Sequence, residues 1–154
     1  MPEPPAPKPG TYLGFDYGEK HIGVAVGQTL TCTANGLDTI PTLGKLARWE
    51  AIGRLVDAWH PCGLVVGLAY QEDGRENPIT PQILKFSRQL EGRFRLPVYT
   101  MDETLSTVES KSLFYQSRAK RTTVFATVRD ILSAQLILQT WLEHIAFQEK
   151  QKNG

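Results

Sequence analysis

The chain has 154 residues and a formal net charge of +1 at pH 7, with 41% hydrophobic and 21% charged residues. This length suits one domain, and the composition is typical of a globular protein. No apolar run approaches the roughly 20 residues that cross a bilayer, which excludes a transmembrane protein. The small net charge excludes a chain that attracts polyanions over its whole surface.

The first ten residues contain five prolines and no apolar stretch. Such a segment is typical of an extended, disordered tail rather than of a secretory signal. We therefore predict a disordered tail over residues 1–10 and a single domain over residues 11–148. The two cysteines, Cys32 and Cys62, are too few for a disulfide framework, which favours a cytoplasmic protein.

Three β segments are predicted directly after the tail. Residues 11–16 and 21–27 are apolar runs separated by a short turn with Gly18, which indicates an antiparallel hairpin. A third β segment over residues 31–40 ends at Pro41.

Strands and helices then alternate. A helix is predicted from the three- to four-residue spacing of apolar side chains at Leu46, Trp49, Ile52, Val56 and Trp59. The apolar run 63–68 indicates a buried, largely parallel strand. Thr80 and Pro81 are typical of a helix start, with Thr80 as the N-cap. We expect that helix to bury Ile83, Leu84, Phe86 and Leu90, and residues 97–101 to form a fifth strand.

Two helices are predicted for the last third of the chain. Residues 106–109 match a capping box and begin the first, residues 118–126 are predicted as a loop, and the second begins at Thr127 and frays from Gln148 onward. The element order βββαβαβαα implies a mixed five-stranded α/β sheet with helices on both faces. Right-handed crossovers place the fourth strand beside the first, which is the ribonuclease-H-like architecture.

Acidic residues occur where separate predicted elements begin or end. Asp16 ends the first strand, Asp102 and Glu103 end the fifth, and Asp130 lies near the start of the last helix. Sites in open α/β sheets form at the carboxyl edge of the strands, so we predict that these acids converge. Oxygen ligands suit Mg²⁺ or Mn²⁺, and clustered carboxylates repel one another without a cation. The pattern favours a metal-dependent nuclease.

Each acid also has a structural explanation. Asp130 could serve a first helical turn, where negative charge is favourable, and Asp16 could close a turn through its side chain. Adjacent residues of a strand point in opposite directions, so only one of Asp102 and Glu103 can face the other acids. We favour Glu103 as the ligand and Asp102 as its supporting neighbour, although the two roles can be exchanged.

A basic stretch precedes Asp130. It contains Arg118, Lys120, Arg121 and Arg129 without an intervening acid. Such a stretch could be a solvated surface, but its place beside a candidate catalytic acid makes contact with nucleic acid phosphates an equal alternative.

The segment 15–27, Phe-Asp-Tyr-Gly-Glu-Lys-His-Ile-Gly-Val-Ala-Val-Gly, resembles the opening motif of the YqgF family, also called RuvX. The resemblance continues at residues 66–68, Asp73-Gly74 and Asp130, and is sharpest at residues 102–109, Asp-Glu-Thr-Leu-Ser-Thr-Val-Glu. It implies a fold related to the RuvC resolvases and a cytoplasmic nuclease that trims the 5′ end of pre-16S rRNA. It further implies that Asp16, Glu103 and Asp130 hold the catalytic metal.

The same resemblance places four residues near the scissile phosphate: Lys20, Arg75, Ser106 and Thr107. Thr104 and Val128 stand where the family usually has arginine and lysine. This departure motivates a second hypothesis, a catalytically weak RNA- or ribosome-binding protein on the same fold. A third hypothesis is a phosphotransferase of the actin and sugar-kinase type, but such proteins need two lobes to enclose the nucleotide and this chain has one. Structured RNA and branched DNA both stay open as substrates. The oligomeric state, monomer or homodimer, stays open as well.

Overall fold

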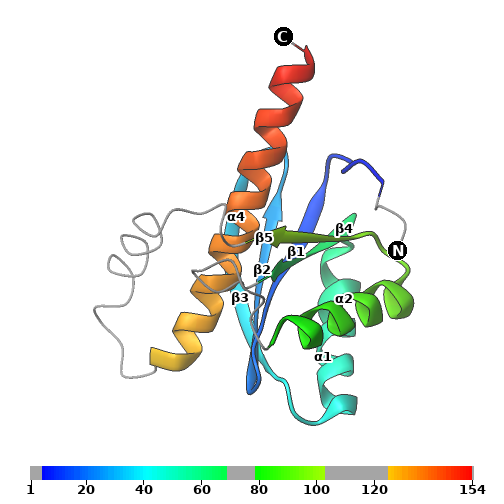
Figure 1. Ribbon diagram of the computed structural model, residues 1–154, viewed down its shortest axis with the longest axis vertical. Coiled ribbons are helices and arrows are strands. Elements are labelled where there is room, and N and C mark those ends of the chain that lie inside the picture. The colour runs from blue at the N-terminus through cyan, green and yellow to red at the C-terminus, as the bar shows by residue number, and fades with distance from the viewer. Residues whose placement is uncertain (1–4, 69–78, 103–124, 154) are drawn as a thin grey trace.

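The structure is a computed structural model that describes residues 5–68, 79–102 and 125–153 (Figure 1). Its elements are β1 (Thr11–Tyr17), β2 (His21–Gln28), β3 (Thr33–Pro41), α1 (Lys45–Trp59), β4 (Gly63–Leu68), α2 (Thr80–Phe94), β5 (Val98–Asp102) and α4 (Phe125–Asn153). The helix predicted to begin at residue 106 lies outside the described residues.

The strands form one mixed sheet in the order β3-β2-β1-β4-β5. The predicted hairpin is confirmed, because β1 pairs antiparallel with β2. The predicted neighbourhood of the first and fourth strands is confirmed as well, since β1 pairs parallel with β4. On the far side of β4, β5 is also parallel. The carboxyl ends of β1, β4 and β5 therefore lie at one edge of the sheet.

Helices cover both faces of the sheet, with α1 and α2 on one side and α4 on the other (Figure 1). Side chains along β1 alternate between these layers. Leu13 and Phe15 are buried against α1 and α2, whereas Tyr12 is buried against α4. The core is thus two apolar layers separated by the sheet.

The layer under α1 and α2 is narrower than the sequence pattern predicts. Trp49 and Ile52 of α1 and Ile83, Phe86 and Leu90 of α2 are buried, as expected. Leu46, Leu84 and Trp59 are instead exposed, by 75%, 36% and 39%. Leu84 is about 100° around the helix from Ile83, and Leu46 and Trp59 lie in the first and last turns of α1. Burial is therefore limited to one narrow stripe in each helix.

Helix α4 is longer at both ends than predicted. It begins at Phe125, inside the segment predicted as a loop, and continues to Asn153 through the residues predicted to fray. Before the final Asn153, the added residues at the C-terminus are Gln, Glu and Lys, which are strong helix formers and need no burial. Of the described helices, none combines the length and apolar character needed to span a membrane.

Two glutamines of α4 fix the helix to the edge strand β3. The side-chain oxygen of Gln139 accepts a hydrogen bond from the backbone N–H of Ala34 at 2.8 Å, and the Gln135 amide donates to the Ala34 carbonyl at 3.0 Å. The Gln139 amide also donates to the carbonyl of Cys32 at 2.8 Å. Because these bonds are directional, they set the position of α4 along the sheet.

Three aromatic rings join β1, β5 and α4 near the amino ends of the two strands. Tyr12 lies 4.8 Å from Trp141, and Tyr99 lies 5.1 Å from Trp141, between ring centroids. The Tyr12 hydroxyl donates to the Lys8 carbonyl, and the Tyr99 hydroxyl donates to the Pro5 carbonyl at 2.6 Å. Part of the proline-rich segment thus contacts the sheet, while the division into a tail and a domain stays a prediction.

The buried Tyr12 should make the protein sensitive to alkali. Burial, reinforced by the neighbouring Tyr99, raises the pKa of Tyr12 to about 12 from its usual value of 10. Above pH 10 the unfolded chain releases this proton and the folded chain does not, so stability falls between roughly pH 10 and pH 12. In urea unfolding, Tyr12→Phe should lose less stability over this range than the wild type. Parallel pH profiles of the two proteins would contradict this. Part of the loss of stability at high pH should remain in the variant, because burial also raises the pKa of Tyr99.

Candidate metal and nucleic-acid site

Asp16 lies near the carboxyl end of β1, on the face that α4 covers. The alternation of β1 places it on the side of Tyr12 and Gly14, opposite to Phe15 and Tyr17. The residue is half-buried, and its register partner on β2 is Gly23. The predicted strand and its terminal acid are therefore found in the expected place.

Asp130 approaches Asp16 through Gly23. A Cβ atom added to Gly23 would lie 2.0 Å from the backbone oxygen of Asp130 and 3.2 Å from the backbone nitrogen of Ile131. The start of α4 thus rests directly on the β2 backbone beside Asp16. This contact brings together two of the three predicted acids, and Asp130 is likewise half-buried.

Other small residues let α4 lie this close to the sheet. An added Cβ would lie 2.8 Å from the Leu138 Cβ at Gly14, 2.8 Å from the Leu142 Cδ1 at Gly27 and 2.2 Å from the Ile131 Cγ2 at Gly36. Ala25, Ala34 and Ala134 are buried in the same layer. This surface was not among the predicted features, although its sequence signal is visible: Gly23, Ala25 and Gly27 are small residues at alternate positions of β2 and so share one face of the strand.

The third predicted acid, Glu103, lies outside the described residues. The backbone of Asp102 ends β5 and pairs with Leu68 of β4. One step earlier, Met101 pairs with Gly67 and is buried in the layer under α4. The described residues contain no group of three histidine, cysteine, aspartate or glutamate side chains placed to hold a metal. The structure therefore places the backbone of Asp130 beside the register partner of Asp16, and the role of all three acids as metal ligands stays a prediction.

Most of the chain matches a known protein family. A family model described as "RuvX: Holliday junction resolvase" matches residues 10–144. The chain belongs to the RuvX family.

Relatives of this RuvX chain carry a common name. The protein named "Putative pre-16S rRNA nuclease" of Methylococcus capsulatus is 58% identical over 142 residues, 92% of this chain and 94% of the relative. A protein of the same name from Legionella pneumophila is 43% identical over 134 residues, 87% of this chain and 96% of the relative. The family and these relatives indicate a hydrolase that acts on nucleic acid.

Solved structures of resolvases with a ribonuclease-H-like fold resemble the fold of the RuvX chain. The fowlpox virus resolvase in complex with Holliday junction DNA has a TM-score of 0.56 and 12% identity, covering 88% of this chain and 98% of that one. The yeast mitochondrial Holliday junction resolvase has a TM-score of 0.54 and 11% identity, covering 99% and 84%. At such low identity the likeness concerns the fold, and the predicted fold is confirmed.

Of the predicted substrate-binding residues in this RuvX chain, Lys20 is described. It is exposed in the turn between β1 and β2, and its carbonyl accepts a hydrogen bond from the Thr42 backbone N–H at 2.9 Å. Arg129 lies in α4, but its side chain is not among those described. Five further predicted residues lie outside the described part of the chain: Arg75, Ser106, Thr107, Lys120 and Arg121.

Proposed function

We propose that this RuvX chain is a metal-dependent nuclease that processes the 5′ end of pre-16S rRNA in the cytoplasm. The observation that carries the proposal is the approach of Asp130 to Asp16 across Gly23. The names of the relatives support the rRNA substrate, and the resolvases of similar fold make branched DNA the second substrate to test.

The two acids fit a hard divalent cation. Both are half-buried, and the backbone of Asp130 lies against Gly23, the register partner of Asp16. Carboxylates that lie close together attract a cation. Carboxylate oxygens are the ligands that Mg²⁺ and Mn²⁺ prefer. We propose that Asp16, Asp130 and Glu103 hold one or two such ions. When bound, the ions would activate a water nucleophile and stabilise the charge that develops on the phosphodiester oxygens.

The geometry of β5 favours Glu103 over Asp102 as the third ligand. Tyr99 and Met101 are buried under α4, so the alternation of a strand predicts residue 103 on that face and residue 102 on the other. Between β1 and β5, the strand β4 offers Gly67 at the level of Met101. A glycine has no side chain that would fill the space between Asp16 and the end of β5.

Phosphate contacts would come from the basic and hydroxyl side chains around the acids. We propose this role for Lys20 on the β1–β2 turn, together with Arg75, Ser106, Thr107, Lys120, Arg121 and Arg129. Such contacts position the substrate strand, and they weaken as the salt concentration rises.

The proposal predicts metal-dependent cleavage with unequal roles for two neighbouring acids. A precursor 16S rRNA fragment and a four-way DNA junction would be tested side by side in Mg²⁺, in Mn²⁺ and in EDTA. We expect RNA cleavage that EDTA abolishes. Glu103→Gln should abolish it too, because a metal ligand is lost, whereas Asp102→Asn should retain cleavage within about tenfold, the mild end of losses for groups that only support a ligand.

Three results would change the assignment. Loss of cleavage in Asp102→Asn, but not in Glu103→Gln, would exchange the roles of the two acids. Cleavage of the junction alone would make branched DNA the substrate. A folded protein that binds RNA in EDTA and cleaves neither substrate would contradict the nuclease proposal and favour the catalytically weak RNA-binding protein.

A further inference from the structure

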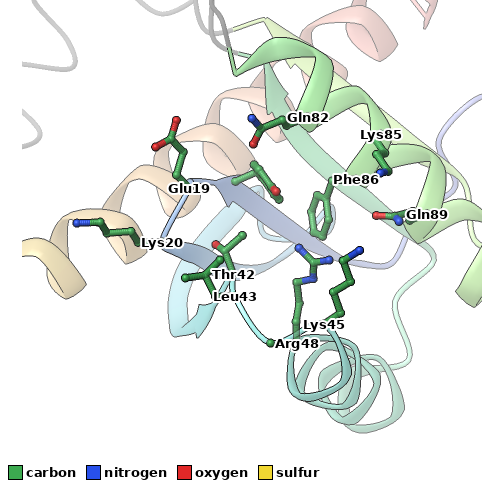
Figure 2. Close-up of a pocket in the computed structure, with 12 residues that line it drawn as sticks. Glu19, Lys20, Thr42, Leu43, Lys45, Arg48, Gln82, Lys85, Phe86 and Gln89 are labelled. Carbon is green, nitrogen blue, oxygen red and sulfur yellow. The ribbon is translucent and has the colours of Figure 1, made fainter.

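A pocket of about 640 Å³ lies on the α1 and α2 side of the sheet, away from α4. It is an open pocket lined by the β1–β2 turn, the segment between β3 and α1, the start of α1 and one stripe of α2 (Figure 2). In Figure 2, Lys45 and Arg48 rise from the start of α1, while Lys85 and Gln89 extend from α2 on the other side. No sequence pattern singled out this cavity.

The decisive residue in the pocket is Arg48. Its side chain is only 6% exposed, yet its Nε atom has no hydrogen-bond partner among the described residues. One face of the guanidinium is covered, because its central carbon lies 5.2 Å from the centre of the Trp49 ring. A buried N–H of a charged group is costly to leave without an acceptor, so a site of this kind favours a ligand with negatively charged oxygen atoms.

The start of helix α1 adds to the positive character of the pocket. Helix α1 begins at Lys45 after Gly44, and both residues line the pocket. This helix has no side-chain cap and no acidic residue in its first turn. The dipole of a helix N-terminus attracts anions, and here no acid in the first turn neutralises it.

Charge and size agree with a phosphorylated ligand. Among the residues that the structure describes, four cations line the pocket against one acid, Glu19, and the cations are Lys20, Lys45, Arg48 and Lys85. Phe86 and Tyr17, whose ring centroids are 5.0 Å apart, supply an aromatic wall. The volume lies within the range of about 300–1,000 Å³ that is usual for small-ligand sites.

We propose that this pocket binds a phosphate group, carried either by the nucleic acid strand or by a free nucleotide. Tyr17 in the pocket wall directly follows Asp16 in β1 but faces the opposite side of the sheet. A strand that passes around this end of the sheet would therefore reach both the acids and the pocket. The strand-bound form of the inference rests on the proposed nuclease function, whereas the free-nucleotide form does not.

The test measures binding without cleavage, in full-length Asp16→Asn protein and EDTA. The probes are a short fluorescent single-stranded RNA and ADP, and the Trp49 indole resonance reports on the pocket. Lys45→Gln/Lys85→Gln should weaken binding of the occupying probe at least about tenfold. Loss of one phosphate contact should also reduce the dependence of the RNA binding constant on salt, measured as the slope of log K against log salt concentration, by about 0.7. Arg48→Met should have the largest effect. If Arg48→Met does not fold, Lys45→Gln/Lys85→Gln still tests the proposal, because both lysines are exposed.

The matched control is Arg54→Gln/Arg88→Gln, which removes the same charge from exposed positions of α1 and α2 that do not line the pocket. Weakened RNA binding alone assigns the pocket to the substrate strand, and weakened ADP binding alone assigns it to a free nucleotide. Effects no larger than those of the control overturn the proposal. Because neither probe is cleaved here, a failure of nuclease activity leaves this result unaffected.

Discussion

Replacing Asp16 with asparagine is expected to lower the rate of metal-dependent cleavage by more than about 100-fold, because loss of groups that only support a metal ligand already costs about 10- to 100-fold. Asparagine keeps the shape of the side chain but removes the negative charge that the cation requires. Single-turnover cleavage across a range of Mn²⁺ concentrations would measure this loss. Thermal unfolding gives a second readout, since Mn²⁺ should raise the melting temperature of the wild type and not of the variant.

Asp57→Asn provides the control for Asp16→Asn. Asp57 is an exposed aspartate on α1, on the other side of the sheet from α4. Its replacement should leave both the cleavage rate and the effect of Mn²⁺ unchanged. Wild-type cleavage by Asp16→Asn would remove this residue from the site, and an equal effect of the two variants would indicate a general charge effect.

The second large effect is expected for Gly23→Ala. The new Cβ atom would lie 2.0 Å from the backbone oxygen of Asp130, a contact that no side-chain rotation can relieve. The start of α4 must therefore move away from β2. Overpacking of this kind costs about 1–3 kcal/mol of stability, which urea unfolding would measure. Because the displaced residue is a proposed metal ligand, cleavage and Mn²⁺ binding should fall further than stability alone predicts.

Gly92→Ala is the matched control for that substitution. An added Cβ at Gly92 of α2 meets nothing within 4 Å, so alanine should stabilise the protein by about 0.5–1 kcal/mol through its better helix propensity. Its cleavage rate should equal that of the wild type. If Gly23→Ala were as stable and as active as Gly92→Ala, the close approach of α4 would not be what positions Asp130.

The strand order and the place of Asp16 could be predicted because both follow from short-range patterns. The hairpin needs only two apolar runs and a tight turn, and the strand–helix alternation then restricts where the fourth strand can lie. Asp16 ends an apolar strand and precedes a turn, so its position at the sheet edge follows from the same pattern.

The burial of Arg48 could not be predicted in this way. A lone arginine beside Trp49 in an amphipathic helix has the sequence pattern of a solvated residue, and its burial depends on α2 and the β3–α1 segment, which come from distant parts of the chain. The exposed Leu46 and Leu84 illustrate the same limit. Helical periodicity gives the direction of a side chain but not which neighbours lie there.

The hydrogen bonds between α4 and β3 also affect how the protein behaves in concentrated solution. β3 is an edge strand, and the backbone N–H and C=O of such a strand can pair with a strand of another molecule. At Ala34 both groups are already bonded to Gln139 and Gln135, and at Cys32 the carbonyl is bonded to Gln139. An incoming strand would have to displace these amides. The glutamines that align the helix thus also protect this stretch of the edge from β-sheet aggregation.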